Sequence, residues 1–272
     1  MPVNKMSNIH KNILNVFFMI EILKILFAMA FLLYSCYSDL KARRVSNGVW
    51  KYMLVSGSVF VIYELFTGGT PYLKALFLSG VVVFISVYIL FHLGAFGGGD
   101  AKGLLVLSIL FPLYPIFQFS GEAYPLLGRP LIGLFTLTVL GNALLLTALI
   151  PLGMFCYNLL HFSPEMLKKP LYMLIGYRTE ISSLKNKEYL ALLEKFEVDE
   201  HGSIMKRFAR TGLDFDANQK PELEEYMKKG LIGKDVWVTP GLPFMLSITA
   251  GFITAIVFGD FIFYIVMCLM LG

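Results

Sequence analysis

Long apolar segments are the feature that most constrains what this chain can fold into. Six stretches are rich enough in apolar residues to form membrane-spanning helices, and they cover residues 16–37, 47–66, 72–93, 101–119, 130–157 and 241–271. A crossing helix needs about 20 mostly apolar residues, because a backbone in hydrocarbon must satisfy its own hydrogen bonds. The composition agrees, since 57% of the residues are hydrophobic and only 15% are charged. The sequence therefore predicts a membrane α-helical fold with about six transmembrane helices.

Acidic residues lie in three of these segments. Glu21 and Lys24 lie in the first, which we interpret as a retained span and not a signal peptide. They are three residues apart, so they share a helix face and can form an ion pair. Glu64, at the end of the second segment, is expected to be solvated. Asp260 interrupts the last segment, where we expect a polar bend at Gly259, with a functional carboxylate as the alternative.

The placement of basic residues predicts the orientation of the chain. They gather in the loops that follow the first, third and fifth spans: Lys41, Arg43, Arg44, Lys102, Lys168, Lys169 and Arg178. Loops enriched in Lys and Arg face the cytoplasm. We therefore expect these loops to be cytoplasmic and both chain termini to lie outside.

Residues 158–239 break the apolar pattern and hold most of the charge. The expected organisation is helices one to five in residues 1–157, a small cytoplasmic α+β domain in 158–239, and the last helix in 240–272. Within the insertion, the amphipathic stretch from Ile181 to Phe196 predicts a helix, and the segment from Asp235 to Thr239 alternates as a strand does. The domain is expected to be a solvated cap, with substrate handling as the alternative.

Neither a metal nor a cofactor is predicted. The three cysteines, Cys36, Cys156 and Cys268, form no CxxC pair, and the four histidines are scattered singly. This arrangement implies no zinc site and no disulfide framework. A nucleic-acid partner is not expected either, and the expected surroundings are the lipid bilayer.

Two aspartates share the predicted cytoplasmic side. Asp39 comes at the inner end of the first span in YSDLKARRVSN, and Asp100 at the inner start of the fourth in FGGGDAKG. Two carboxylates that approach each other share a proton, which suits general acid–base catalysis. Each residue also has a simpler explanation, because Asp39 stands among basic residues at a helix end and Asp100 can cap a helix.

Three consecutive glycines, Gly97, Gly98 and Gly99, precede the second aspartate. Glycine has no side chain and permits backbone conformations that are closed to other residues. Such a segment lets another backbone, such as that of a peptide substrate, approach Asp100 closely. A plain flexible loop is the alternative.

These residues together resemble a known family. GGGD, from Gly97 to Asp100, resembles the GxGD motif of the membrane aspartyl proteases that comprise the type IV prepilin peptidases and the archaeal preflagellin peptidases. The first-aspartate motif of that family is matched by Asp39, Arg43, Arg44 and Asn47. TPGLPF, from Thr239 to Phe244, is similar to the start of the last span in the archaeal members.

The resemblance implies that Asp39 and Asp100 are the catalytic residues of an endopeptidase without a metal. It implies a substrate that is a preflagellin or a type IV prepilin-like precursor, cut after a short basic leader at the cytoplasmic face. The bacterial members commonly carry two CxxC pairs and methylate the new N-terminus. Both pairs are missing from this sequence, which predicts a peptidase without methyltransferase activity.

Several functions remain open at this point. An ion- or proton-coupled transporter could use Asp39 and Asp100 as ligands, whereas a noncatalytic assembly scaffold would need neither acid. Acidic residues of the insertion are candidates for attracting the basic leader, although exposed acids are commonly only solvated: Asp199, Glu200, Asp214 and Asp216.

Overall fold

The computed structural model describes residues 2–128, 133–186, 190–198, 204–214, 219–240 and 243–271. It divides into two compact units, one made of Met1–Thr147 with Pro243–Gly272 and the other of Ala148–Leu242. The predicted soluble segment 158–239 falls within the second unit.

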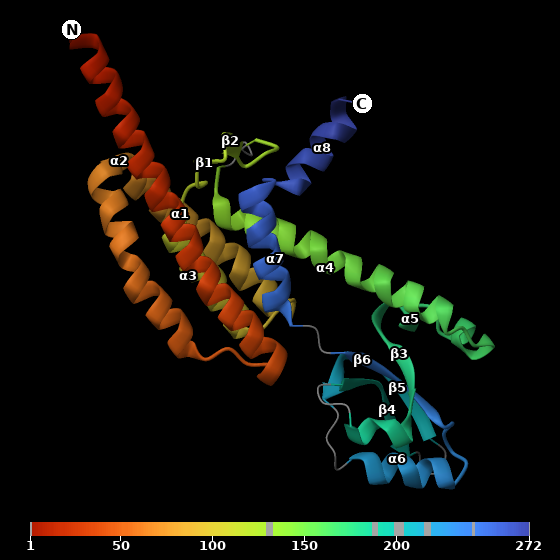
Figure 1. Ribbon diagram of the computed structural model, residues 1–272. Coiled ribbons are helices and arrows are strands. Elements are labelled where there is room, and N and C mark those ends of the chain that lie inside the picture. Colours follow the sequence, from red (N-terminus) through yellow and green to blue (C-terminus); the bar gives the residue numbers. More distant parts are fainter. Residues whose placement is uncertain are drawn as a thin grey trace. The chain divides into compact units, whose positions relative to one another are not determined.

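The first unit is almost entirely helical (Figure 1). Its helices are α1 (Pro2–Ala42), α2 (Asn47–His92), α3 (Gly98–Leu110), the first part of α4 (Phe135–Leu160), α7 (Phe244–Val257) and α8 (Phe261–Leu271). A short antiparallel hairpin, β1 (Phe117–Phe119) and β2 (Glu122–Tyr124), follows α3.

In the described part of the chain, three helices are long and apolar enough to cross a membrane: residues 16–42 of α1, α2 and α4. A fourth is added if α7 and α8, which are bent by 58° at their junction, form one span. These helices indicate a membrane protein, but the predicted six spans are not confirmed.

Helix α2 contains the predicted second and third spans. It is 46 residues long, more than twice the length that one crossing needs, and it breaks at Gly69 with φ 55° and ψ −142°. Figure 1 shows α2 turning back on itself. The parts of α2 before and after Gly69 form two limbs, and both lie along α3. On the first limb, Trp50 lies beside Gly103 and Gly57 beside Leu110. On the second limb, Ser79 lies beside Ser108 and Phe91 beside Gly98. The first limb therefore runs parallel to α3 and the second antiparallel.

The predicted fourth span, 101–119, is wrong in its length. Helix α3 has 13 residues and ends at Leu110, although the sequence stays apolar beyond it. Pro112 lacks a backbone donor and disfavours helical geometry in the residue before it. Phe111 accordingly leaves the helix with φ −127° and ψ 68°. At 1.5 Å per residue, α3 is about 20 Å long and shorter than the hydrocarbon core.

Buried aromatic rings hold α3, α4 and α7 together. Phe111, just after α3, lies 5.2 Å from Phe135 of α4 and 5.7 Å from Phe252 of α7, measured between ring centroids. Phe135 and Phe252 are 5.4 Å apart and nearly perpendicular. Edge-to-face rings combine a large buried area with favourable electrostatics, so this cluster is the centre of the first unit.

The junction of α7 and α8 is the polar bend expected near Gly259. Gly259 adopts φ 111°, and its carbonyl accepts a hydrogen bond from the Asn142 side chain at 2.9 Å. The Asp260 carboxylate accepts from the Thr138 hydroxyl at 3.1 Å and from the Phe263 amide at 3.0 Å. Asp260 thus caps the start of α8 and fastens the bend to α4.

The second unit contains a small antiparallel sheet. Its strands are β3 (Tyr177–Glu180), β4 (Leu190–Val198), β5 (Ile204–Asp214) and β6 (Asp235–Pro240), in the order β3-β6-β4-β5. The helical elements around them are η1 (Pro164–Lys168), α5 (Tyr172–Ile175), η2 (Ile181–Asn186) and α6 (Gln219–Lys228). The expected strand around Asp235 to Thr239 is present as β6.

The predicted helix from Ile181 to Phe196 is wrong. In the described part of this stretch only η2 is helical, and the chain then forms β4, which pairs with both β5 and β6. Leu190 and Leu192 enter one core, whereas Leu193 on the other face packs with Trp237. Because both faces of β4 are buried, its apolar residues do not alternate simply and the pattern could be mistaken for a helix.

Candidate active site

The first candidate aspartate, Asp39, lies in the last turn of α1 and is partly exposed. Its carbonyl accepts the Arg43 amide at 2.9 Å, and Arg43 adopts φ 51°. A left-handed residue after a helix ends it and turns the chain away. The Ser38 hydroxyl, which donates to the Arg44 carbonyl at 2.8 Å, fastens this turn. Asp39 therefore projects from a defined helix end.

The second candidate, Asp100, lies in the first turn of α3 and is also partly exposed. Gly97 occupies the N-cap position, and the Asp100 carboxylate accepts its amide hydrogen at 3.0 Å. The sequence allows Asp100 to be the N-cap itself, whereas in the structure Asp100 stands three residues after the N-cap. This contact is the half of a capping box in which the third residue reaches back to the N-cap amide.

The surroundings of Asp100 favour its protonated form. Burial is the largest cause and raises the pKa of Asp100 to about 6, the Gly97 amide opposes that rise, and the negative charge of Asp39 adds to it. The two carboxylates therefore lie within electrostatic reach of each other, as a shared site requires.

The start of α7 is a third part of this site. The Met245 amide donates to the Asp39 carboxylate at 3.4 Å, and the Phe244 ring stacks on Phe96 with centroids 5.1 Å apart. Phe96 directly precedes the glycines. No sequence motif assigned Met245 to the site, although TPGLPF, which ends one residue before it, resembles a family feature and was the available signal.

Lys102 connects the two aspartate motifs. Its ammonium group donates to the Asn47 side-chain oxygen at 2.7 Å. Asn47 is the first residue of α2 and belongs to the motif that begins with Asp39. The contact thus ties the first turns of α2 and α3 together beside both aspartates.

The three glycines are not required by the packing of the protein itself. None of them has a positive φ, and Gly97 and Gly98 are exposed. A Cβ atom would lie 3.9 Å from the Phe91 ring at Gly98 and 3.8 Å from Val45 at Gly99, which are ordinary contacts. A Cβ atom at Gly97 would likewise lie 3.5 Å from the Asp100 carboxylate, so the described residues leave room for a Cβ atom at each of the three positions.

Of the four acidic residues considered for leader binding, one lies in the described part of the chain. Asp199, Glu200 and Asp216 lie outside the described residues, and Asp214 is the last residue of β5. In the ranges that are described, no group of three or more His, Cys, Asp or Glu side chains is placed to hold a metal ion.

The predicted Glu21–Lys24 ion pair forms, with 3.2 Å between the Glu21 carboxylate and the Lys24 ammonium group. Glu64, which was expected to be solvated, is only 7% exposed and also pairs with Lys24. The first limb of α2 packs against α1, so the acid at its end faces the lysine and not water. That expectation is therefore wrong.

The fold is that of an α-helical membrane protein, with one aspartate in the last turn of α1 and another in the first turn of α3. One family model, the type IV leader peptidase family, matches residues 26–152, and a second, archaeal peptidase A24 C-terminus type II, matches residues 168–261. The chain is therefore similar to this peptidase family over residues 26–152 and to its archaeal C-terminal part over residues 168–261. The resemblance deduced from the aspartate motifs is thus confirmed.

Three relatives extend this likeness over most of the chain. The preflagellin peptidase of Methanococcus voltae is 28% identical over 240 residues, which are 87% of this chain and 95% of the relative. That of Methanocaldococcus jannaschii is 28% identical over 86% of this chain and 92% of its own length. That of Methanococcus maripaludis is 24% identical over 82% and 89%.

Proposed function

We propose that this chain is a GxGD-type membrane aspartyl endopeptidase in which Asp39 and Asp100 are the catalytic residues. It removes the short basic leader from preflagellins or type IV prepilin-like precursors. The match to a leader peptidase family model and the names of the three relatives support the reaction class. The observation that carries the residue assignment is the hydrogen bond of 2.7 Å from Lys102 to Asn47, which joins the helix that carries Asp100 to the motif that begins with Asp39.

The proposed reaction needs one ionised and one protonated carboxylate. The ionised group takes a proton from water, whose oxygen attacks the scissile carbonyl carbon while the protonated group donates to the carbonyl oxygen. When the tetrahedral intermediate collapses, the C–N bond breaks and the leaving nitrogen takes up a proton from the pair. The products are a free carboxyl group and a free amine. The roles of acid and base belong to the pair, because coupled carboxylates titrate as a unit.

The proposed site faces the cytoplasm, with both termini outside. Basic loops beside the aspartates support this orientation through the positive-inside rule. At that depth the pair would meet a precursor where its basic leader gives way to an apolar helix. We further propose that the enzyme lacks methyltransferase activity, since the chain has no CxxC pair.

The glycines have a specific role in this proposal. Gly97, Gly98 and Gly99 leave the space in which the substrate backbone lies beside Asp100. Their ordinary φ values and the ordinary contacts that a Cβ atom would make support this role, because neither backbone strain nor internal packing explains all three.

The test uses the purified full-length protein in detergent with a peptide that carries a basic leader ending in glycine, followed by an apolar segment. Mass spectrometry of the products should show a single cut at the junction. The Asp39→Asn and Asp100→Asn variants should be inactive while they keep the circular dichroism spectrum of the parent. Equal cleavage by parent and variants would rule out the dyad. A parent that cuts nothing but carries ions into liposomes would favour the transporter.

A further inference from the structure

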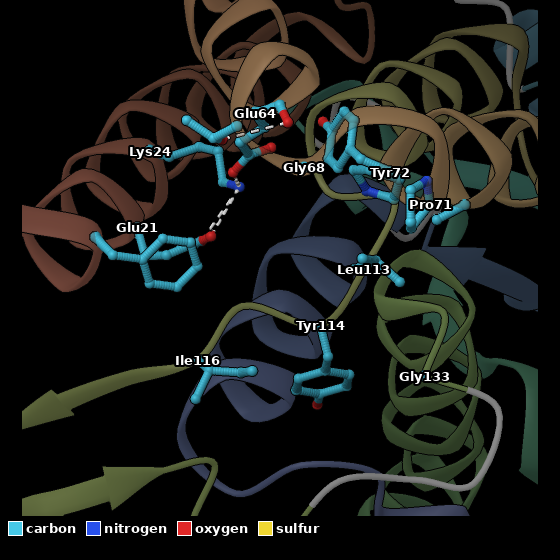
Figure 2. A pocket seen from close by; sticks show the side chains of 14 residues that line it. Glu21, Lys24, Glu64, Gly68, Pro71, Tyr72, Leu113, Tyr114, Ile116 and Gly133 are labelled. Atoms are coloured by element: carbon cyan, nitrogen blue, oxygen red, sulfur yellow. Dashed lines mark hydrogen bonds and ion pairs between the residues drawn. The ribbon is translucent and has the colours of Figure 1, made fainter. Parts of the chain in front are cut away.

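A cavity of about 540 Å³ lies in the first unit, away from the aspartates (Figure 2). Its wall comes from α1, from both limbs of α2 near their break, and from the segment around Leu113 that follows α3. Glu21 on this wall precedes Asp39 by 18 residues of the same helix, or about 27 Å at 1.5 Å per residue. The cavity is therefore distinct from the candidate active site.

Three charged side chains lie together on this wall: Lys24 between Glu21 and Glu64 (Figure 2). Their side chains are 3%, 8% and 9% exposed, respectively, so all three are more than nine-tenths buried. Two carboxylates against one ammonium group leave one negative charge in excess when both are ionised. A buried charge without a counter-charge is strongly unfavourable, so such a cluster either holds a proton or takes up an additional cation.

Hydrogen bonding at the cluster is incomplete. Tyr72 lies near Glu64. Yet among the residues described here, neither the Tyr72 hydroxyl nor the second Glu64 oxygen has a hydrogen bond of ordinary geometry, and both atoms are buried. A ligand with hydrogen-bond donors and a positive charge would satisfy the carboxylate oxygen, as an ammonium group does.

The rest of the cavity wall is mostly apolar and aromatic. Pro71, Leu113 and Ile116 supply aliphatic surface, and Phe17 and Tyr114 supply rings. Ring faces attract cations, and the volume lies within the range of about 300–1,000 Å³ that is usual for small-molecule sites. A bare inorganic cation would leave most of this apolar surface uncovered, whereas an anion would meet the excess negative charge.

We propose that this cavity binds an organic cation, consisting of a primary ammonium group on an apolar body. The ammonium group lies against the carboxylates of Glu64 and Glu21, and the body lies along Pro71 and Leu113. Such a ligand can be a free aliphatic amine or a lipid whose head group ends in an amine. The inference does not depend on the proposed peptidase activity.

The test measures the thermal unfolding and calorimetric binding of the full-length protein in detergent with n-hexylammonium chloride. The matched compounds are 1-hexanol, which has the same body without the charge, and potassium chloride, which has the charge without the body. We expect saturable binding of hexylammonium alone. Equal effects of hexylammonium and hexanol, or equal effects of hexylammonium and potassium, would overturn the proposal.

Two variants locate the site. Glu64→Gln removes the excess charge and should weaken hexylammonium binding at least 10-fold, whereas the exposed Glu122→Gln in β2 is the matched control and should not. Leu113→Trp fills the cavity without changing its charge and should abolish binding, so the idea remains testable if Glu64→Gln fails to fold. Unchanged binding in Leu113→Trp contradicts the assignment. Asp100→Asn should bind as the parent does, which separates this site from the peptidase.

A final comparison distinguishes the two sources of the amine. Phosphatidylethanolamine in the micelle should compete with hexylammonium if the natural ligand is a lipid, and phosphatidylcholine, which lacks the N–H donors, should not. Competition by the ethanolamine lipid alone assigns the cavity to a lipid amine, and no competition by either lipid assigns it to a free amine. Equal competition by both lipids would contradict recognition of a primary ammonium group.

Discussion

Replacing Gly98 by alanine separates the substrate role of the glycines from any role in folding. Gly98 is exposed, lies in the first turn of α3 and has no positive φ. The new Cβ atom would be 3.9 Å from the Phe91 ring, an ordinary contact. Gly→Ala at a compatible position stabilises a protein by about 0.4–1 kcal/mol, so the melting temperature should stay constant or rise.

Cleavage by Gly98→Ala should nevertheless fall. If a substrate backbone occupies the space beside Gly98, the added methyl group overpacks the complex, at a cost of about 1–3 kcal/mol. That cost corresponds to a loss of about 5- to 150-fold in kcat/KM, at 1.36 kcal/mol for each factor of ten. The assay follows cleavage of the leader peptide by mass spectrometry and the melting temperature of the same preparation in detergent.

Gly103→Ala is the matched control, five residues further along α3. Gly103 is buried, and a Cβ atom there would lie 2.8 Å from the Trp50 ring, so the ring must shift. We expect a loss of stability of about 1–3 kcal/mol with a smaller effect on cleavage per folded molecule. If Gly98→Ala cuts the peptide at the parent rate, the argument for backbone approach at the glycines is refuted.

Three further predictions concern the charged residues. Burial raises the pKa of Asp100 to about 6, so its ionisation should lower the free energy of unfolding as the pH rises from about 4 to above 6, by at most about 3 kcal/mol. Asp100→Asn should therefore raise the melting temperature more at pH 8 than at pH 4. Asp260→Ala removes the cap of α8 and should lower the free energy of unfolding by about 1 kcal/mol, while cleavage of the leader peptide continues at the parent rate. Loss of cleavage without loss of stability would assign Asp260 to catalysis. Lys24→Met leaves Glu21 and Glu64 buried together and should cost about 3–5 kcal/mol in detergent unfolding, whereas an unchanged melting temperature would mean that the ion pairs are not buried.

The length of the apolar segments and the position of the charged residues predicted a membrane helix correctly where the helix ends at the same residues as the apolar segment. They failed at α3, because Leu-Phe-Pro-Leu after residue 109 is as apolar as a span but contains a proline that cannot continue the helix. They also placed a bend at Gly259 correctly, since a glycine beside a charged residue in an overlong segment is a local signal. Local residue patterns of this kind predicted a bend, whereas they did not predict the residue at which a helix ends.

Pairings between distant residues could not be predicted from the sequence. Lys24 and Glu64 are 40 residues apart, and nothing near Glu64 shows that its helix limb packs on α1. An acid at the end of a span is usually solvated, so the general expectation was reasonable and wrong. In the second unit, β4 was missed for the same reason, since its strand character depends on pairing with β5 and β6.

Both candidate aspartates lie against the N-terminus of a helix, but their donors differ in origin. Asp100 accepts the N-cap amide of its own helix, which its local sequence can indicate. Asp39 accepts the Met245 amide in the first turn of α7, 206 residues later. Free amides at a helix start stabilise a negative charge, so α7 contributes to the surroundings of Asp39 as directly as its own motif does. Since the segment TPGLPF ends at Phe244, the first residue of α7, changes in that segment should move the donor and alter the site without touching either aspartate.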